Sequence, residues 1–149
     1  MIMALLMLQT FHVLFLGLHD WIPLGRLNDV AAVRAEHSIR QLVVGTLIST
    51  IPFAFGWAAS VHYLGKPYSH WLRVWLWASY AMLFAGELQA WWVPYLLRPE
   101  PQRAARYDAM FGATHAFLPA HNGIRPNTLH VILHMATALT LVLLWLTSH

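Results

Sequence analysis

Histidine and glutamate recur inside the apolar runs of this sequence. His130 and His134 lie four residues apart near the start of the last run, so both rings would project from one face of a helix. His12 and His19 are seven residues apart in the first run, and Glu87 lies inside the third. Ionisable residues within membrane segments usually face the protein interior and have partners there. We therefore expect these side chains to form a site.

The chemistry open to such a site is limited by the absence of cysteine. Imidazole and carboxylate without thiolate suit zinc, iron, manganese or copper. The candidate metal ligands are His130, His134, Glu87 and His12. The candidate cofactor-binding histidines, which could also hold haem between facing helices, are His12, His19, His130 and His134. A transition metal ion or haem is therefore the expected cofactor, with Glu87 and His134 as candidate catalytic residues.

Two other readings of the same residues remain open. The first is a small proton-coupled transporter in which Glu87 titrates without any metal. The second is an accessory or structural subunit of a membrane complex, in which polar contacts between helices only fix helix register. This purely structural interpretation is favoured for His130 alone and for the His19–Asp20 pair, which lie near an interface. Glu87 and His134 lie deeper and are harder to explain in that way.

The composition indicates which elements must position these groups. Of the 149 residues, 58% are hydrophobic and 10% are charged, with a mean hydropathy of +0.51, against about 25% charged residues in an average soluble domain. Each of four apolar runs has about the 20 residues that a helix needs to cross a bilayer. They cover about 2–24, 41–64, 71–97 and 127–148. The sequence predicts an all-α integral membrane protein, a single four-transmembrane-helix bundle over residues 1–149.

The basic residues predict its orientation. The first loop carries Arg26, Arg34 and Arg40; the third carries Arg98, Arg103, Arg106 and Arg125; the second has only Lys66. The positive-inside rule places loops one and three in the cytoplasm and both termini outside, most simply in a bacterial inner membrane. The basic residues form no patch for nucleic acid. The expected partners are the lipid bilayer, a lipid-like or small-molecule ligand, and a second copy or a larger membrane complex.

Loop signals add detail near the cytoplasmic end. Pro101 and Gly112 predict a short interfacial helix in the third loop, and Asn28 or Asp29 predicts the start of a helix that runs towards the second span. His115 and His121 follow in the third loop and could lie over the mouth of a cavity. His37 is expected to be solvated.

Helical rise places the polar groups at two depths. The deeper set is His12, Glu87 and His134, and the shallower set is His19, Asp20 and His130, with Trp91 or Trp92 at a similar height. The rest of the last run, from Met135 to Leu146, has only threonine as a polar residue and predicts plain lipid-soluble helix. The leading functional prediction is a membrane protein with a cytoplasm-facing His/Glu site that binds a metal ion or haem and could serve a small oxidoreductase or lipid-modifying enzyme.

Overall fold

The computed structural model describes residues 1–148, and His149 lies outside them. Within that range the chain is helical and has no β-strand, only an isolated bridge between His121 and Ile124. The elements are α1 (Ile2–Leu18), η1 (Gly25–Leu27), α2 (Val30–Glu36), α3 (Ile39–His62), α4 (His70–Glu87), η2 (Leu88–Trp92), α5 (Val93–Leu96), α6 (Pro101–Phe111) and α7 (Thr128–Ser148). Among the described residues, α3 and α7 are long and apolar enough to cross a membrane.

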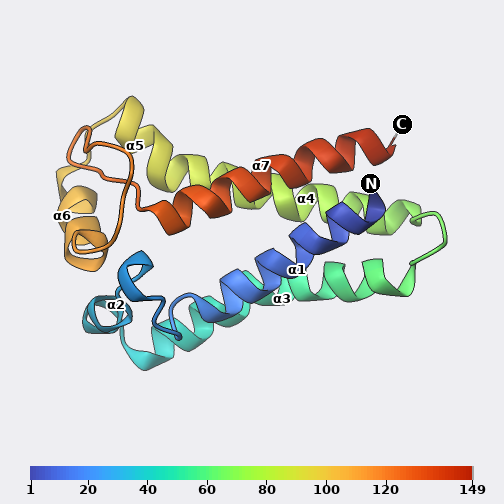
Figure 1. Cartoon of the computed structure of the whole chain (residues 1–149), viewed down its shortest axis with the longest axis horizontal. Helices are drawn as coiled ribbons and strands as arrows, with labels where there is room; N and C mark the ends of the chain where they lie inside the picture. Colours follow the sequence, from blue (N-terminus) through green and yellow to red (C-terminus); the bar gives the residue numbers. More distant parts are fainter. Residues whose placement is uncertain (149) are drawn as a thin grey trace.

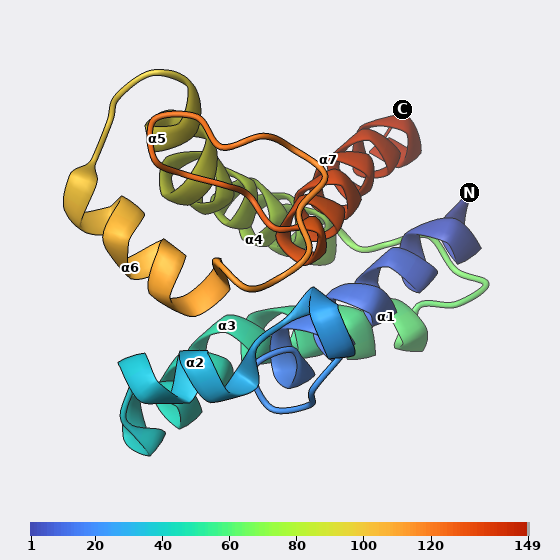
Figure 2. The same cartoon turned by 60° about the vertical axis from the view of Figure 1, so that its left-hand side comes forward.

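Helices α1, α3, α4 and α7 run along the long axis of the molecule (Figure 1). Helix α1 packs against α3 and α7, and α4 packs against the same two helices. Both ends of the described chain lie at one end of this arrangement, and α2, α5 and α6 lie at the other. Figure 2 shows α6 lying across that second end beside α2, which it contacts. The polar residues of interest are therefore held between α1, α4 and α7 and beneath α2 and α6.

Helix α1 ends at Leu18, earlier than the apolar run over 2–24 predicted. The Asn28 side chain explains the early end, because it folds back beneath the helix. Its Nδ2 donates to the carbonyls of His19 (2.6 Å) and Ile22 (2.9 Å), and its Oδ1 accepts from the backbone N–H of Leu24 (2.6 Å). A longer helix would have left the His19 carbonyl without a donor, because Pro23 has no N–H, and the Asn28 amide supplies that donor.

The first loop contains a separate helix that does not continue into α3. Asp29 caps α2 by accepting from the backbone N–H of Ala32 at 2.9 Å. The chain then becomes extended at His37, and α3 starts with a capping box in which Ser38 and Gln41 bond each other's backbone N–H groups. Because this box begins a new helix, α2 is free to turn and pack against α6.

The third apolar run is not one regular helix. After Glu87 it widens into the π-helical segment η2, where the N–H of Val93 bonds the carbonyl of Leu88. Pro94 follows and has no N–H, so the Ala90 carbonyl lacks its usual helical donor. That carbonyl accepts instead from Arg103 Nη1 (3.0 Å) and from the Tyr107 hydroxyl (3.2 Å). Helix α6 is therefore anchored on the irregular turn.

Further hydrogen bonds from Arg103 and Arg125 hold α6 in place. Arg103 Nη1 also donates to the Gln89 carbonyl at 2.9 Å, and burial raises the pKa of the Tyr107 hydroxyl, which keeps its proton for donation. The helix begins at Pro101 and ends before Gly112, as the sequence predicts. Arg125 then donates to the carbonyls of Gly112 (2.7 Å) and Thr114 (3.1 Å), so it stabilises the end of α6.

Candidate functional site

A buried hydrogen-bonded chain joins three helices at the deeper level. Nε2 of His12, on α1, lies 3.0 Å from Oγ1 of Thr137, on α7. The same Thr137 oxygen lies 2.8 Å from Oε1 of Glu87, at the end of α4. His12 and Thr137 are 0% exposed and Glu87 is 6% exposed, so solvent does not compete for these bonds. The three side chains form one continuous polar path within an apolar interior.

The His12 ring has a defined orientation in this chain. Its Nδ1 lies 2.7 Å from the carbonyl of Leu8, which can only accept, so Nδ1 carries a proton. Nε2 is therefore the nitrogen that can gain or lose one. Tyr80 and Phe53 pack around the ring, with centroids 5.0 Å and 6.5 Å away.

His134 lies on α7 and is paired with a different partner. The indole N–H of Trp92 donates to His134 Nδ1 at 3.1 Å, so the neutral ring carries its proton on Nε2. His134 Nε2 is buried and has no hydrogen-bond partner among the described residues, and the same is true of Glu87 Oε2. The deeper level therefore holds both an unused donor and an unused acceptor, which is uncommon in native structures.

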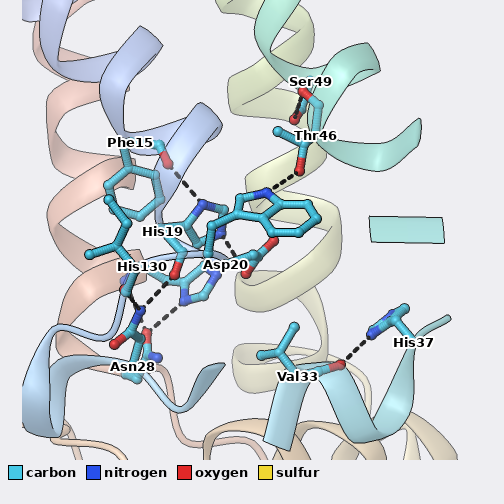
Figure 3. A network of polar contacts seen from close by, with 12 residues as sticks. Phe15, His19, Asp20, Asn28, Val33, His37, Thr46, Ser49 and His130 are labelled. Atoms are coloured by element: carbon cyan, nitrogen blue, oxygen red, sulfur yellow. Dashed lines mark hydrogen bonds and ion pairs between the residues drawn. The ribbon is translucent and has the colours of Figure 1, made fainter. Parts of the chain in front are cut away.

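The shallower set also comes together, at the ends of α1 and α7 (Figure 3). His19 Nδ1 donates to the Phe15 carbonyl at 2.9 Å, and His19 Nε2 lies 3.2 Å from Asp20 Oδ1. The His130 ring is edge-on to that of His19, with centroids 5.9 Å apart. His130 Nδ1 donates to Oδ1 of Asn127, at 2.7 Å, which leaves Nε2 as an acceptor.

This shallower set borders a cavity of about 330 Å³ between α2, α3, α6 and the ends of α1 and α7. Its polar lining residues are His19, Asp20, His37, Gln41, Thr46, Ser49, Tyr107 and His130, and its aromatic lining residues include Trp91 and Phe111. Within the described part of the chain, no lysine or arginine lines it. The volume is in the range of small-molecule sites. Trp91 therefore reaches a cavity, whereas Trp92 is engaged by His134.

The candidate metal ligands do not form one ligand set. Among residues 1–148, no group of three or more histidine, aspartate or glutamate side chains could hold a metal ion together. Thr137 separates His12 from Glu87, and Trp92 occupies one nitrogen of His134. A haem bound to His12 would need the space that Tyr80 and Phe53 fill. The buried side chains of His12, Glu87 and His134 are therefore better arranged for proton exchange than for binding one metal ion.

The two loop histidines make hydrogen bonds within the loops and are not among the residues that line the cavity. His115 Nδ1 lies 2.7 Å from Oγ1 of Thr128, and its backbone N–H donates to the carbonyl of Arg26. His121 Nδ1 bonds the Tyr95 carbonyl, which also accepts from Asn122 Nδ2. Both histidines thus fix the course of the third loop.

Sequence reasoning missed Thr137. The stretch from Met135 to Leu146 was expected to be plain lipid-soluble helix, yet Thr137 is fully buried and links His12 to Glu87. A usable signal was present: Thr137 follows His130 by seven residues and His134 by three, so it shares their helical face. His37 and Tyr107 were also missed as cavity residues.

The sequence matches no protein-family model, and no curated protein or solved structure shows significant similarity to it.

Proposed function

We propose that this chain is a membrane protein that moves protons, as a small proton-coupled carrier in which Glu87 and His12 exchange a proton through Thr137. The hydrogen-bonded chain from His12 to Glu87 is the observation that carries the proposal. It satisfies the requirement of a relay, because each pair of neighbours lies within hydrogen-bond distance. It also uses the residue types that mark proton pathways inside membranes.

The chain supports two proton arrangements that use the same atoms. In one, His12 is doubly protonated and donates from Nε2 to Thr137, whose hydroxyl donates to ionised Glu87. In the other, protonated Glu87 donates to Thr137, whose hydroxyl donates to Nε2 of neutral His12. Passing from the second to the first moves one proton from Glu87 to Thr137 and one from Thr137 to His12. Both hydrogen bonds of the relay are kept, so the exchange needs no rearrangement of the helices. The Leu133 carbonyl, 3.0 Å from the same hydroxyl, competes for its single proton.

The second carboxyl oxygen of Glu87 allows the relay to exchange a proton with its surroundings. Glu87 Oε2 is buried and receives no hydrogen bond from the described residues, so it is the atom at which a proton can enter or leave. The rings of His134 and His130 lie with centroids 6.3 Å apart, and His130 lines the cavity. On α7, His134 and His130 therefore lie one and two turns from Thr137, on the side of the cavity.

The proposal includes four membrane spans, α1, α3, α4 with its continuation through α5, and α7. Only 17% of the most apolar stretch of α3 and 39% of that of α7 are buried within the chain. Large apolar side chains such as Met7, Ile48, Met82 and Met135 are at least 67% exposed, and lipid would cover them. The arginines of the first and third loops support a cytoplasmic position for α2, α6 and the cavity.

Proton movement in proteoliposomes tests the proposal. The full chain is reconstituted with an internal pH dye, and a potassium diffusion potential drives proton uptake. Glu87→Gln keeps an oxygen that accepts from Thr137 but removes the titrating group, and Thr137→Val removes the hydroxyl at nearly constant shape. We expect both variants to slow uptake on the order of tenfold or more.

Matched controls separate loss of the relay from loss of folding. Thr140→Val removes a buried hydroxyl from the same helix that bonds only the Ala136 carbonyl, and Glu36→Gln removes an exposed carboxylate. Both should transport as the wild type does. Unchanged uptake in Glu87→Gln would sink the proposal.

The same protein preparations test the cofactor hypothesis. Elemental analysis and an absorption spectrum are recorded for the wild type beside His134→Ala. Near-stoichiometric metal or a porphyrin band that disappears in the variant would favour a metal or haem enzyme. A colourless, metal-free protein that transports protons would favour the relay.

A further inference from the structure

The cavity between α2, α3 and α6 has a lining whose chemistry is distinct from that of the buried relay. One wall is aromatic: the ring centroid of Trp91 lies 4.4 Å from that of Tyr107 and 5.4 Å from that of Phe111. The His130 ring packs against the same indole, at 4.7 Å. Aromatic faces of this kind attract cations, and tryptophan attracts them most strongly.

Hydrogen-bond acceptors make up much of the polar lining. Asp20 engages His19 through Oδ1, and its other carboxylate oxygen has no such contact in the described residues. His130 Nε2 is an acceptor because Nδ1 donates to Asn127. His37 has the same arrangement, since its Nδ1 donates to the Val33 carbonyl at 3.2 Å. A ligand with N–H or O–H donors would find these acceptors in the cavity.

The charge of the lining selects among such ligands. No lysine or arginine of the described chain lines the cavity, so an anion would find no counter-charge. Asp20 and the aromatic wall both favour a positive charge. A quaternary ammonium would use the aromatic wall but could not donate to Asp20 or His130.

We infer that this cavity binds a small organic ammonium group carrying N–H donors, held between Asp20, His130 and the aromatic wall of Trp91, Tyr107 and Phe111. The inference rests on the proposed carrier, of which this group would be the substrate. The ammonium can belong to a soluble amine or to the headgroup of an aminophospholipid, since the cavity lies at the end of the helices where headgroups would be. Asp20 and His130 provide the polar contacts, and the aromatic side chains line the wall beside which the charge would lie.

Binding is measured with the full chain in nanodiscs of phosphatidylcholine, using 5-fluorotryptophan labelling and ¹⁹F NMR. The Trp91 signal is assigned from Trp91→Phe. The probes are ethanolammonium, choline and acetate. Ethanolammonium should shift the Trp91 signal with saturation, choline should bind about tenfold more weakly because it has no N–H donor, and acetate should not bind.

Two variants test the site by different routes. Asp20→Asn removes the charge and should weaken ethanolammonium binding about tenfold, whereas Glu36→Gln, an exposed carboxylate outside the cavity, should not. Gly45→Leu places a side chain in the cavity, because a Cβ at Gly45 has no atom within 4 Å. Gly86 is equally open but does not line the cavity, so Gly86→Leu is the matched control.

The lipid composition distinguishes the two sources of the ammonium. If phosphatidylethanolamine in the nanodisc competes with ethanolammonium, the headgroup occupies the cavity; if it does not, the ligand is a soluble amine. Equal binding of ethanolammonium and choline, or binding unaffected by both Asp20→Asn and Gly45→Leu, would overturn the inference. Because binding is measured without a proton gradient, its failure and a failure of proton transport are separate results.

Discussion

The indole N–H of Trp92 donates to Nδ1 of His134 across 3.1 Å. Trp92 is the last residue of the π-helical segment η2, and His134 lies on α7. The bond fixes the neutral His134 ring in the tautomer whose proton is on Nε2, and it directs that proton towards the interior. π-Helical turns often occur at functional sites, and here the turn places Trp91 in the lining of the cavity and Trp92 against His134.

The substitution Trp92→Phe should allow the neutral His134 ring to carry its proton on either nitrogen. The aromatic ring is kept but the donor is lost, at a cost of about 1 kcal/mol in unfolding free energy. In ¹⁵N spectra of histidine-labelled protein, Nδ1 of His134 should lose the shift of a hydrogen-bonded acceptor. Trp75→Phe is the control, because its indole donates to the Pro52 carbonyl, away from the site. An unchanged His134 spectrum would contradict the bond.

Thr137→Val and Thr140→Val should differ in stability although the two threonines are both 0% exposed on one helix. Thr137→Val leaves Oε1 of Glu87 and Nε2 of His12 without their partner, at a cost of about 1–3 kcal/mol. The Thr140 hydroxyl bonds only a carbonyl of its own helix, so its loss should be nearly neutral. Unfolding in mixed micelles measures both. Equal losses would mean that the hydroxyl of Thr137 has no special role.

Arg103→Met should loosen α6. The substitution removes two hydrogen bonds, to the Gln89 and Ala90 carbonyls, and an ion pair with Glu100 at 2.9 Å. We expect a loss of about 1–2 kcal/mol and faster hydrogen exchange over 101–111. Arg106→Met, at an exposed position of the same helix, should leave exchange unchanged. If both variants behave alike, the irregular turn does not anchor α6.

Gly56→Val should weaken the packing of α3 on α4. A Cβ at Gly56 would lie 3.0 Å from a methyl of Leu76 and 3.4 Å from the indole of Trp75. We expect a loss of about 1–3 kcal/mol from overpacking, read from unfolding in mixed micelles. Gly45→Val meets no atom within 4 Å and serves as the control on the same helix. A tolerated Gly56→Val would show that the two helices separate easily.

The sequence predicts the positions of the apolar helices better than the residues at which they end. The runs over 41–64 and 127–148 correspond closely to α3 and α7, because length and apolar composition are local properties. The ends of α1 and α4 depend on contacts made across the chain. Asn28 closes the end of α1, and α6 supplies the donors that the carbonyl of Ala90 needs.

The site could also be predicted only in part, because some of its contacts are made between distant parts of the chain. His12 and Glu87 were expected at one depth, and they occupy the two ends of the chain through Thr137. A threonine in an apolar helix usually bonds its own backbone, as Thr137 also does with the Leu133 carbonyl at 3.0 Å, so its residue type gave no warning. His37 and Tyr107 reach the cavity only because the loops fold over it, which helical spacing cannot indicate.

His12, His19 and His37 all bond the carbonyl four residues earlier through Nδ1. In each, one nitrogen anchors the ring to its own helix and the other is left for chemistry. An asparagine carries an amide nitrogen about as far from the backbone as Nδ1, so it can keep the anchor while deleting Nε2. Asparagine is therefore a more informative replacement than alanine at these positions, because it removes the Nε2 atom of the histidine and keeps the hydrogen bond to the backbone.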